Sequence, residues 1–167
     1  AVGYDAIRFL SPIKTDEAPK AVAAAASAER VYVLDEKKSS LFIYDAAGRL
    51  IKAVGRPGSE RTAFSAPQGL AVGPRGDIFV ADTGNSRIQI LDADGEFQGA
   101  FSSRGSEPGL LKNPESVAVG SDGRVYVADT GNHRVQVFTR QGILLFQFGE
   151  SGKENGQFSG PSKVVVD

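Results

Sequence analysis

Residues 125–138 read VYVADTGNHRVQVF, and residues 78–91 read IFVADTGNSRIQIL. The two stretches match in residue class along their whole length after a shift of 47 positions. Self-similarity at a fixed period of this size is typical of solenoids and propellers. The repeat therefore has to be interpreted before any single residue.

Turn-forming residues recur with the same period. They include Pro67, Pro114 and Pro161, and also Gly48, Gly95 and Gly142. Within one unit, four short apolar runs lie at 69–72, 78–81, 87–91 and 96–101, and Gly, Asn and Asp residues separate them. Runs of this length, rich in β-branched and aromatic residues, indicate strands, and the intervening residues indicate tight turns. Each unit is therefore predicted to be a four-stranded antiparallel meander.

The burial expected for successive strands predicts how the meanders pack. The first two strands of a unit are apolar at nearly every position, whereas the third alternates Ile88 and Ile90 with Arg87 and Gln89. This gradient predicts crowded inner strands and wetter outer strands, the third included. Sheets stacked around an axis in this way form a β-propeller. The predicted fold class is all-β, a propeller of four-stranded blades, with a flat β-solenoid as the structural alternative.

The period divides the chain into segments that amount to about three and a half blades, fewer than the ~4 to 8 that close a ring. We expect the remaining blades to come from the same polypeptide or a sister chain, because end blades otherwise expose apolar faces and sheet edges. The predicted segments are 1–19, an outer strand of a preceding blade (residues 4–10) plus a loop; 20–66, a divergent blade; 67–113 and 114–160, two regular blades; and 161–167, the first strand of a further blade.

Composition excludes several functional classes. The formal net charge is −1, so no global field gathers nucleic acid or an anionic membrane surface. The chain has no Cys, which excludes disulfides, thiolate metal ligands and a Cys nucleophile. No apolar run approaches the ~18 to 20 residues that a membrane span needs. Binding of nucleic acid would thus require a local basic patch, and no membrane partner is expected.

Residues 128–138, with Gly149 closing the unit and residues 156–158 leading to Pro161, resemble the NHL repeat family. Residues 81–91 form a second match. The resemblance implies a six-bladed propeller with mainly binding roles, namely RNA or protein recognition, or extracytoplasmic sensing and adhesion in bacteria. One enzymatic relative that resembles the family in fold, a peptide-amidating lyase, uses a His-ligated metal. The bacterial character of the repeats, with the lack of Cys, favours a periplasmic or secreted location over others that stay open.

The first unit departs from the NHL pattern. Asp35 is kept, but Lys37 and Lys38 replace the turn Gly and Asn, and Ser40 replaces the Arg. This unit is still in register, because its apolar runs at 31–34 and 41–44 lie one period before those of the second unit.

The polar residues of the repeated turn have structural and functional interpretations. Asp82 and Asp129 are expected to cap the backbone N–H groups of Gly84 and Gly131 as Asx-type turns, with a ligand-binding carboxylate as the alternative. Asn85 and Asn132 are expected to be turn formers in the same way. Arg87 and Arg134 begin the third strand, where a planar guanidinium can clamp loop carboxylates or carbonyls or can contact a ligand.

His133 is the only His in the chain. Because a metal site needs three or four convergent ligands, no metal is expected there. We expect an exposed turn residue in the position that Ser86 occupies in the preceding unit. No Ser lies in a nucleophile-elbow context such as G-x-S-x-G, so a catalytic triad is not expected either.

The Gly-rich segments 55–61 and 103–109 lack the G-x-x-x-x-G-K-[ST] pattern of phosphate loops and are predicted to be inter-blade crossings. Loops held on a rigid scaffold are where binding residues concentrate. Acidic and basic residues are interleaved there with few aromatics, which favours a protein or peptide partner over RNA. The candidate binding residues on this face are Arg56, Arg61, Gln68, Arg104, Lys112, Asn113, Glu115 and His133.

These features predict a non-catalytic interaction module without a cofactor. An RNA-binding propeller, a propeller lyase or hydrolase with its active site in missing blades, and a purely structural arc are the alternatives. An active site in the channel would need a cluster of carboxylates or metal ligands. The innermost runs 70–72, 117–119 and 164–166 are apolar, and only Gln68, Glu115 and Lys163 are placed to line its mouth.

Overall fold

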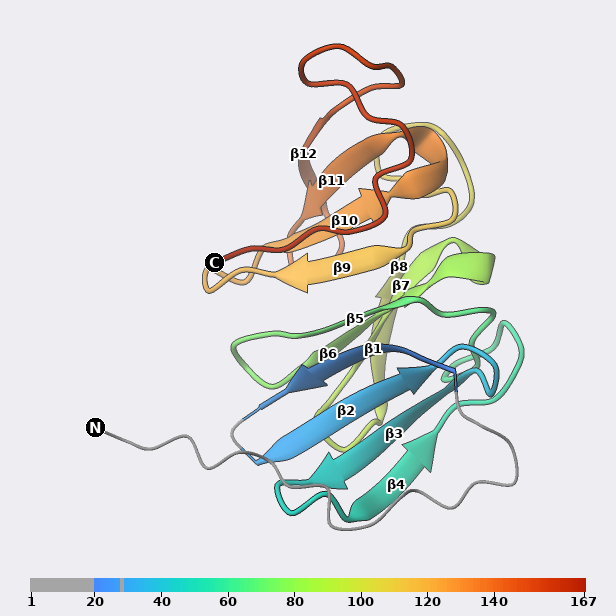
Figure 1. The fold of residues 1–167 in the computed structure, drawn as a ribbon, viewed down its shortest axis with the longest axis vertical. Coiled ribbons are helices and arrows are strands. Elements are labelled where there is room, and N and C mark those ends of the chain that lie inside the picture. The colour runs from blue at the N-terminus through green and yellow to red at the C-terminus, as the bar shows by residue number, and fades with distance from the viewer. Residues whose placement is uncertain (1–19, 28) are drawn as a thin grey trace.

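The computed structural model describes residues 20–27 and 29–167. These residues form three four-stranded antiparallel sheets that follow one another along the long axis of the molecule (Figure 1). Blade 1 contains β1 (Ala21–Ala26), β2 (Arg30–Asp35), β3 (Ser40–Asp45) and β4 (Leu50–Val54). Blade 2 contains β5 (Gly69–Val72), β6 (Ile78–Asp82), β7 (Arg87–Leu91) and β8 (Phe97–Phe101). Blade 3 contains β9 (Ser116–Val119), β10 (Val125–Asp129), β11 (Arg134–Phe138) and β12 (Leu144–Phe148).

Every strand pairs with its neighbours inside its own meander, so the β-solenoid alternative is wrong. In a solenoid, the strands of successive coils pair with one another, whereas here successive sheets contact face to face. The inner strands β1, β5 and β9 lie next to one another at the same edge of the three sheets. The all-β prediction of propeller blades is confirmed, and the chain forms part of a β-propeller.

The second strand of the middle blade, β6, is buried on both faces, because the seam on each side of it holds an apolar core. Along β6, Ile78 and Val80 pack into the core shared with blade 1, and Phe79 and Ala81 pack into the core shared with blade 3. Adjacent residues of a strand point to opposite faces, so two cores require a continuous apolar run. The ring of Phe138 closes the second core against Phe101, with centroids 5.0 Å apart.

The prediction of a wetter third strand is wrong. Every residue of β11 is buried, and in β7 only Arg87 is half-buried. Large apolar side chains lie exposed in the fourth strands β4 and β12. These are Leu50 and Ile51 in β4, and Leu145, Phe146 and Phe148 in β12.

Two predicted strands lie at the ends of the chain. The predicted strand at 4–10 lies outside the described residues. Residues 161–167 form no backbone ladder with any described residue, so the first strand of a further blade stays a prediction. Instead, the Val164 N–H donates to Ser116 Oγ at 3.2 Å, which holds this segment beside β9. No helix among the described residues is long and apolar enough to cross a membrane.

Candidate binding face

The loops between blades and the turns between second and third strands lie at the same end of the sheets. We call this end the loop face. It contains the inter-blade loops 55–68, 102–115 and 149–161 and the short 3₁₀ turns Thr83–Asn85 and Thr130–Asn132. Each loop is folded back on itself by a single parallel bridge. The bridges join Pro57 to Phe64, Arg104 to Leu111 and Ser151 to Phe158, one period apart.

In blade 2, a buried carboxylate organises the loop that leads from blade 1. Asp82 has no exposed surface, and its Oδ1 accepts the N–H of Ser65 at 2.8 Å. Its Oδ2 accepts Arg87 Nε at 2.8 Å, Asn85 Nδ2 at 2.9 Å and Gln89 Nε2 at 3.2 Å. We call this carboxylate with its three side-chain donors the clamp. Both oxygens are satisfied, which a buried charge requires.

The clamp donors also hold the loop backbone. Arg87 Nη2 donates to the carbonyls of Glu60 and Ala63 at 2.9 and 3.0 Å. Gln89 Nε2 donates to Ala63 O at 2.7 Å, and Asn85 Nδ2 donates to the carbonyl of Gly58 at 2.9 Å. The guanidinium and the two amides therefore each bridge the carboxylate and the loop, so that the loop is bonded to its blade.

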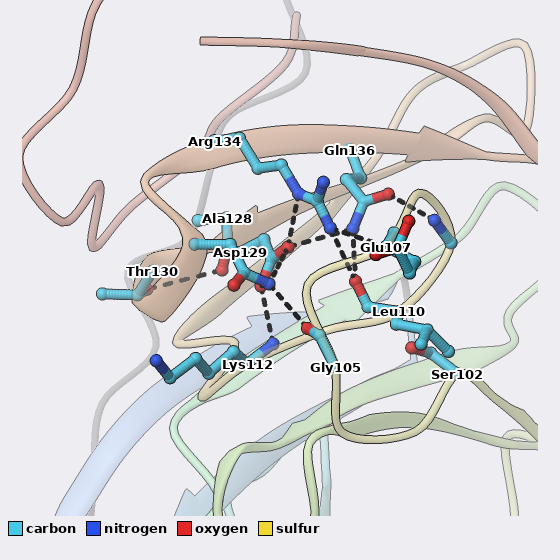
Figure 2. Close-up of polar contacts among 12 residues, drawn as sticks. Ser102, Gly105, Glu107, Leu110, Lys112, Ala128, Asp129, Thr130, Arg134 and Gln136 are labelled. Atoms are coloured by element: carbon cyan, nitrogen blue, oxygen red, sulfur yellow. Dashed lines mark hydrogen bonds and ion pairs between the residues drawn. The ribbon is translucent and has the colours of Figure 1, made fainter. Parts of the chain in front are cut away.

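The clamp recurs in blade 3 (Figure 2). Arg134 Nε donates to Asp129 Oδ2 at 2.8 Å, and Gln136 Nε2 donates to the same oxygen at 3.0 Å. The Lys112 N–H donates to Asp129 Oδ1 at 2.7 Å. On the loop side, Arg134 reaches the carbonyls of Glu107 and Leu110, Gln136 reaches that of Leu110, and Asn132 reaches that of Gly105.

The expectation that Asp82 and Asp129 cap the glycines of their own turns is wrong. Neither carboxylate accepts a backbone N–H of its turn, and the N–H of Gly131 donates instead to the carbonyl of Lys112 at 2.9 Å. The carboxylates point toward the inter-blade loop, because this loop passes over the turn and presents its own N–H groups to them. The loop comes so close that a Cβ on Gly131 would lie 2.7 Å from the carbonyl oxygen of Lys112, which explains the glycine.

Two further turn residues connect each blade to the chain that enters the next one. Thr83 Oγ1 donates to Pro114 O at 2.7 Å, and Thr130 Oγ1 donates to Pro161 O at 2.8 Å. His133 is half-buried rather than exposed, because its Nδ1 accepts the N–H of Gly160 at 2.9 Å. It has a left-handed backbone, with φ of 57°, as has Ser86 in the equivalent position, with φ of 54°.

Blade 1 keeps the carboxylate and lacks the donors. Asp35 is fully buried, and its Oδ1 accepts the Lys38 N–H at 2.9 Å, an Asx-type turn. Within the described part of the chain, no donor reaches Oδ2. The positions of the Asn, Arg and Gln donors hold Lys38, Ser40 and Phe42. The ammonium group of Lys38 lies 5.8 Å from the centre of the Phe42 ring instead.

The candidate binding residues divide into separate groups. Arg56, Arg61, Arg104, Lys112 and Asn113 are exposed on the inter-blade loops. Arg56 approaches Glu60 at 3.4 Å, and the guanidinium of Arg61 lies 5.4 Å from the centre of the Phe97 ring. His133, as described above, is bonded to Gly160. The structure therefore places the exposed charged candidates on the inter-blade loops, whereas His133 of the turn is half-buried.

Gln68 and Glu115 lie apart from the exposed loop residues. Both are half-buried and line a groove of about 640 Å³ along the inner strands, with Lys163 beside them. Apolar residues of β5, β9 and the segment 162–166 form most of the groove. Over residues 20–27 and 29–167, no group of three or more His, Cys, Asp or Glu side chains is arranged to hold a metal ion.

The sequence interpretation missed Gln89 and Gln136 as clamp residues. Both are fully buried in the third strand, and Gln136 Oε1 also accepts the N–H of Gly109 at 2.8 Å. The available signal was an amide at the same position of both repeats, within runs that are otherwise apolar. Such a residue is expected to be hydrogen-bonded inside the fold.

The opposite end of the sheets carries the turns between first and second strands and between third and fourth strands. There, Arg140 of blade 3 binds Asp77 of blade 2 through two hydrogen bonds of 2.6 and 2.7 Å. The side-chain hydrogen bonds from Arg140 hold the pKa of Asp77 below its usual value. The seam between blades 1 and 2 has the reverse polarity, because Arg30 of blade 1 binds the Ala93 carbonyl and the Asp94 carboxylate of blade 2.

Solved structures with a similar fold have different activities. A hydrazine synthase from Kuenenia stuttgartiensis superposes with a TM-score of 0.67 at 16% identity, covering 96% of this chain and 41% of that one. A catalytically inactive virginiamycin B lyase from Staphylococcus aureus, solved with quinupristin, gives 0.63 at 19%, covering 88% and 44%. A nidogen/laminin complex gives 0.61 at 18%, covering 78% and 52%. The chain thus spans about half the length of these structures or less.

Sequence comparison is more specific than these structural matches. No curated protein sequence matches the chain. The family model of the NHL repeat matches residues 64–91 and 111–138. Each match runs from the end of an inter-blade loop through the clamp to the end of the third strand. The chain is therefore part of a β-propeller that contains NHL repeats in its second and third blades.

Proposed function

We propose that the chain is a non-catalytic interaction module whose loop face binds a protein or peptide partner. The observation that carries the proposal is the clamp. Its hydrogen bonds go to the backbone of the loop and do not involve the exposed side chains of the loop. Loops 55–68 and 102–115 are each held by hydrogen bonds from Arg, Gln and Asn side chains of the following blade. A surface that is already ordered loses little conformational entropy on binding.

The charge on this face supports a protein partner over RNA. Exposed Arg56 and Arg104 alternate with the exposed acids Glu60 and Glu107. Single-stranded nucleic acid binds best to a basic groove with stacking aromatics, whereas interleaved charges suit a partner that presents both signs. The similar fold of a chain in a nidogen/laminin complex supports a protein partner for this face.

The proposal is tested by protein capture from native extract with the full chain as bait. One bait carries Arg56→Ala and Arg104→Ala. The matched control carries Arg49→Ala and Arg75→Ala, which remove the same charge from exposed residues at the opposite end. We expect a discrete protein to be retained by the wild type and the control, and to be lost from the loop-face variant.

Two other results would contradict the proposal. Material that is released by nuclease, and whose retention falls steeply with salt, would show that the face binds RNA. Loss of the captured protein from the control bait instead of the loop-face bait would place the contact surface at the other end of the sheets. Melting temperatures of all three baits must agree, so that loss of binding is not loss of fold.

A further inference from the structure

A pocket of about 320 Å³ lies in the seam between blades 2 and 3, at the end opposite the loop face. Its apolar lining includes the ring of Phe79, Val119 and the half-exposed side chain of Leu145. Three turns contribute its charged residues. Arg75 and Asp77 come from the turn between β5 and β6, Asp122 and Arg124 come in the opposite order from the equivalent turn of blade 3, and Arg140 comes from the turn between β11 and β12.

The charges of this pocket do not cancel. Asp77 is engaged by Arg140 at 2.6 and 2.7 Å. Asp122 lies 3.3 Å from Arg124 Nε and also accepts the Arg124 N–H at 3.0 Å. Arg75 makes no hydrogen bond or ion pair with any residue that the structure describes, and its charge acts on Asp77 only through space, where it helps to lower the pKa of that carboxyl. Once both acids are paired, this exposed guanidinium is one uncompensated positive charge.

In the seam between blades 1 and 2, which we call the first seam, polar residues occupy the positions of two apolar pocket residues. There, Tyr32 takes the position of Phe79, and its hydroxyl donates to the Ala93 carbonyl across the seam at 3.3 Å. Phe79 has no hydroxyl, so in the second seam this ring offers only an apolar surface. Leu145 likewise replaces Gln98, which in blade 2 donates to Asp92 at 3.1 Å. Polar contacts of the first seam are thus replaced by apolar lining in the second.

We propose that this pocket binds a small organic monocarboxylate with an apolar ring or chain. Arg75, and the Nη1 group of Arg140 that bonds no described residue, supply charge-assisted donors for the carboxylate. Phe79, Val119 and Leu145 contact the apolar body, as in pockets where a few polar groups orient an apolar ligand. The volume lies at the low end of the range of about 300 to 1,000 Å³ for ligand pockets, which limits the ligand to a small molecule.

The single uncompensated charge of the pocket argues against a more highly charged anion. A carboxylate monoanion balances that one positive charge, whereas a phosphate dianion would leave a second negative charge without a partner beside Asp77 and Asp122. The apolar lining also offers nothing to the remaining phosphate oxygens. This site is separate from the loop face, so its outcome is independent of the proposed function.

Calorimetric titration of the full chain with sodium benzoate and sodium hexanoate tests the proposal, with benzyl alcohol as the neutral counterpart of benzoate and ionic strength held constant. We expect saturable binding of at least one carboxylate and about tenfold weaker binding of the alcohol. Arg75→Ala should weaken the carboxylate by about tenfold and leave the alcohol unchanged. Leu145→Ala should weaken both. Arg104→Ala, which removes the same charge from the loop face, should change neither.

Three results would contradict the proposal. No saturation with either carboxylate at about 10 mM would mean that the pocket holds no such ligand. Equal carboxylate affinity in Arg75→Ala and the wild type would show binding elsewhere. An equal loss in Arg75→Ala and Arg104→Ala would show general attraction of the anion to positive charge. Arg75 is exposed and unpaired among the described residues, so its replacement is expected to leave the melting temperature unchanged.

Discussion

The turn after the second strand is built differently in blade 1 and in blades 2 and 3. All three blades bury an aspartate there with no exposed surface. In blades 2 and 3, Asp82 and Asp129 each accept bonds from an Arg, a Gln, an Asn and the passing loop. In blade 1, Asp35 accepts one N–H from its own turn, and its Oδ2 has no partner among the described residues.

The difference separates two tasks of the repeat. Blade 1 forms the same antiparallel meander without the clamp, so strand pairing and core packing suffice for a blade. The clamp adds the attachment of an inter-blade loop. Clamp residues are therefore expected to affect stability through buried charge and loop order, and in different degrees in the two kinds of blade.

The largest expected effect is that of Asp129→Ala. It leaves the guanidinium of Arg134, whose side chain is 9% exposed, without its carboxylate, and it leaves Gln136 without one acceptor. Removing one partner of a buried ion pair costs about 3 to 5 kcal/mol of unfolding free energy. Asp35→Ala, which removes a carboxylate with no cationic partner among the described residues, should cost about 1 kcal/mol or less. Chemical denaturation of both variants measures their losses of unfolding free energy. Equal losses would contradict the division of the repeat into a meander and a separate clamp.

Gln136→Leu should have the next largest effect. The amide is fully buried and bonds Leu110 O, Asp129 Oδ2 and the Gly109 N–H. Leucine satisfies none of these groups, so we expect a loss of about 1 to 3 kcal/mol and faster amide exchange in the loop. The exposed cross-strand neighbour Gln147 supplies the control, because Gln147→Leu should change stability by less than about 0.5 kcal/mol. Exchange that stays slow in the loop would argue against its attachment by Gln136.

Ser40→Arg sharpens the comparison in the other direction. It restores an arginine at the clamp position of blade 1, where no donor from the described part of the chain reaches Asp35 Oδ2. A bond from the guanidinium should raise the unfolding free energy by about 1 kcal/mol. The change also removes the Ser40 hydroxyl, which donates to Lys38 O at 2.9 Å. Ser40→Ala, which loses that bond without adding an arginine, is the control. If the two variants are equally stable, Asp35 Oδ2 is out of reach of the side chain at position 40.

The smallest effect concerns the seam pair Asp77–Arg140 and depends on pH. Hydrogen bonds from Arg140 lower the pKa of Asp77 in the folded chain. A lowered folded pKa contributes stability above the unfolded value of about 3.9. That contribution is lost as the pH falls through the folded pKa. The stability difference between the wild type and Asp77→Asn should therefore shrink as the pH falls below about 4. Denaturation curves at several pH values measure this difference in unfolding free energy. A difference that stays constant with pH would show that titration of Asp77 does not change the stability that the pair contributes.

Local chemistry explains what could be predicted about the fold and the site. Strands such as β6 and β7 follow from runs of β-branched residues, and the turns follow from Gly and Asn, so their positions depend on near neighbours in sequence. The clamp could not be assigned in the same way. Asp82 accepts from Ser65, and Arg87 donates to Glu60 and Ala63, residues that approach only when one blade packs on the next.

Burial is the second property that depended on neighbours in space. Gln89 alternates with isoleucines and so appeared solvent-facing, yet the loop from blade 1 covers it and leaves it with no exposed surface. His133 was expected to be an exposed turn residue, but the segment after blade 3 presents the Gly160 N–H to it. In both cases, a segment far away in the sequence decides the environment of the side chain.

The sequence by itself determined the repeat, the four-stranded blades and the NHL turn, because strand alternation and turn chemistry operate over a few residues. Only the tertiary structure decided which donors meet each buried aspartate, which residues lie exposed on the loop face, and where a pocket opens between blades. These depend on how two sheets and a loop from different parts of the chain are packed. Hydrogen bonds and burial form between surfaces that the sequence lists far apart, and the stacking of the blades brings those surfaces together.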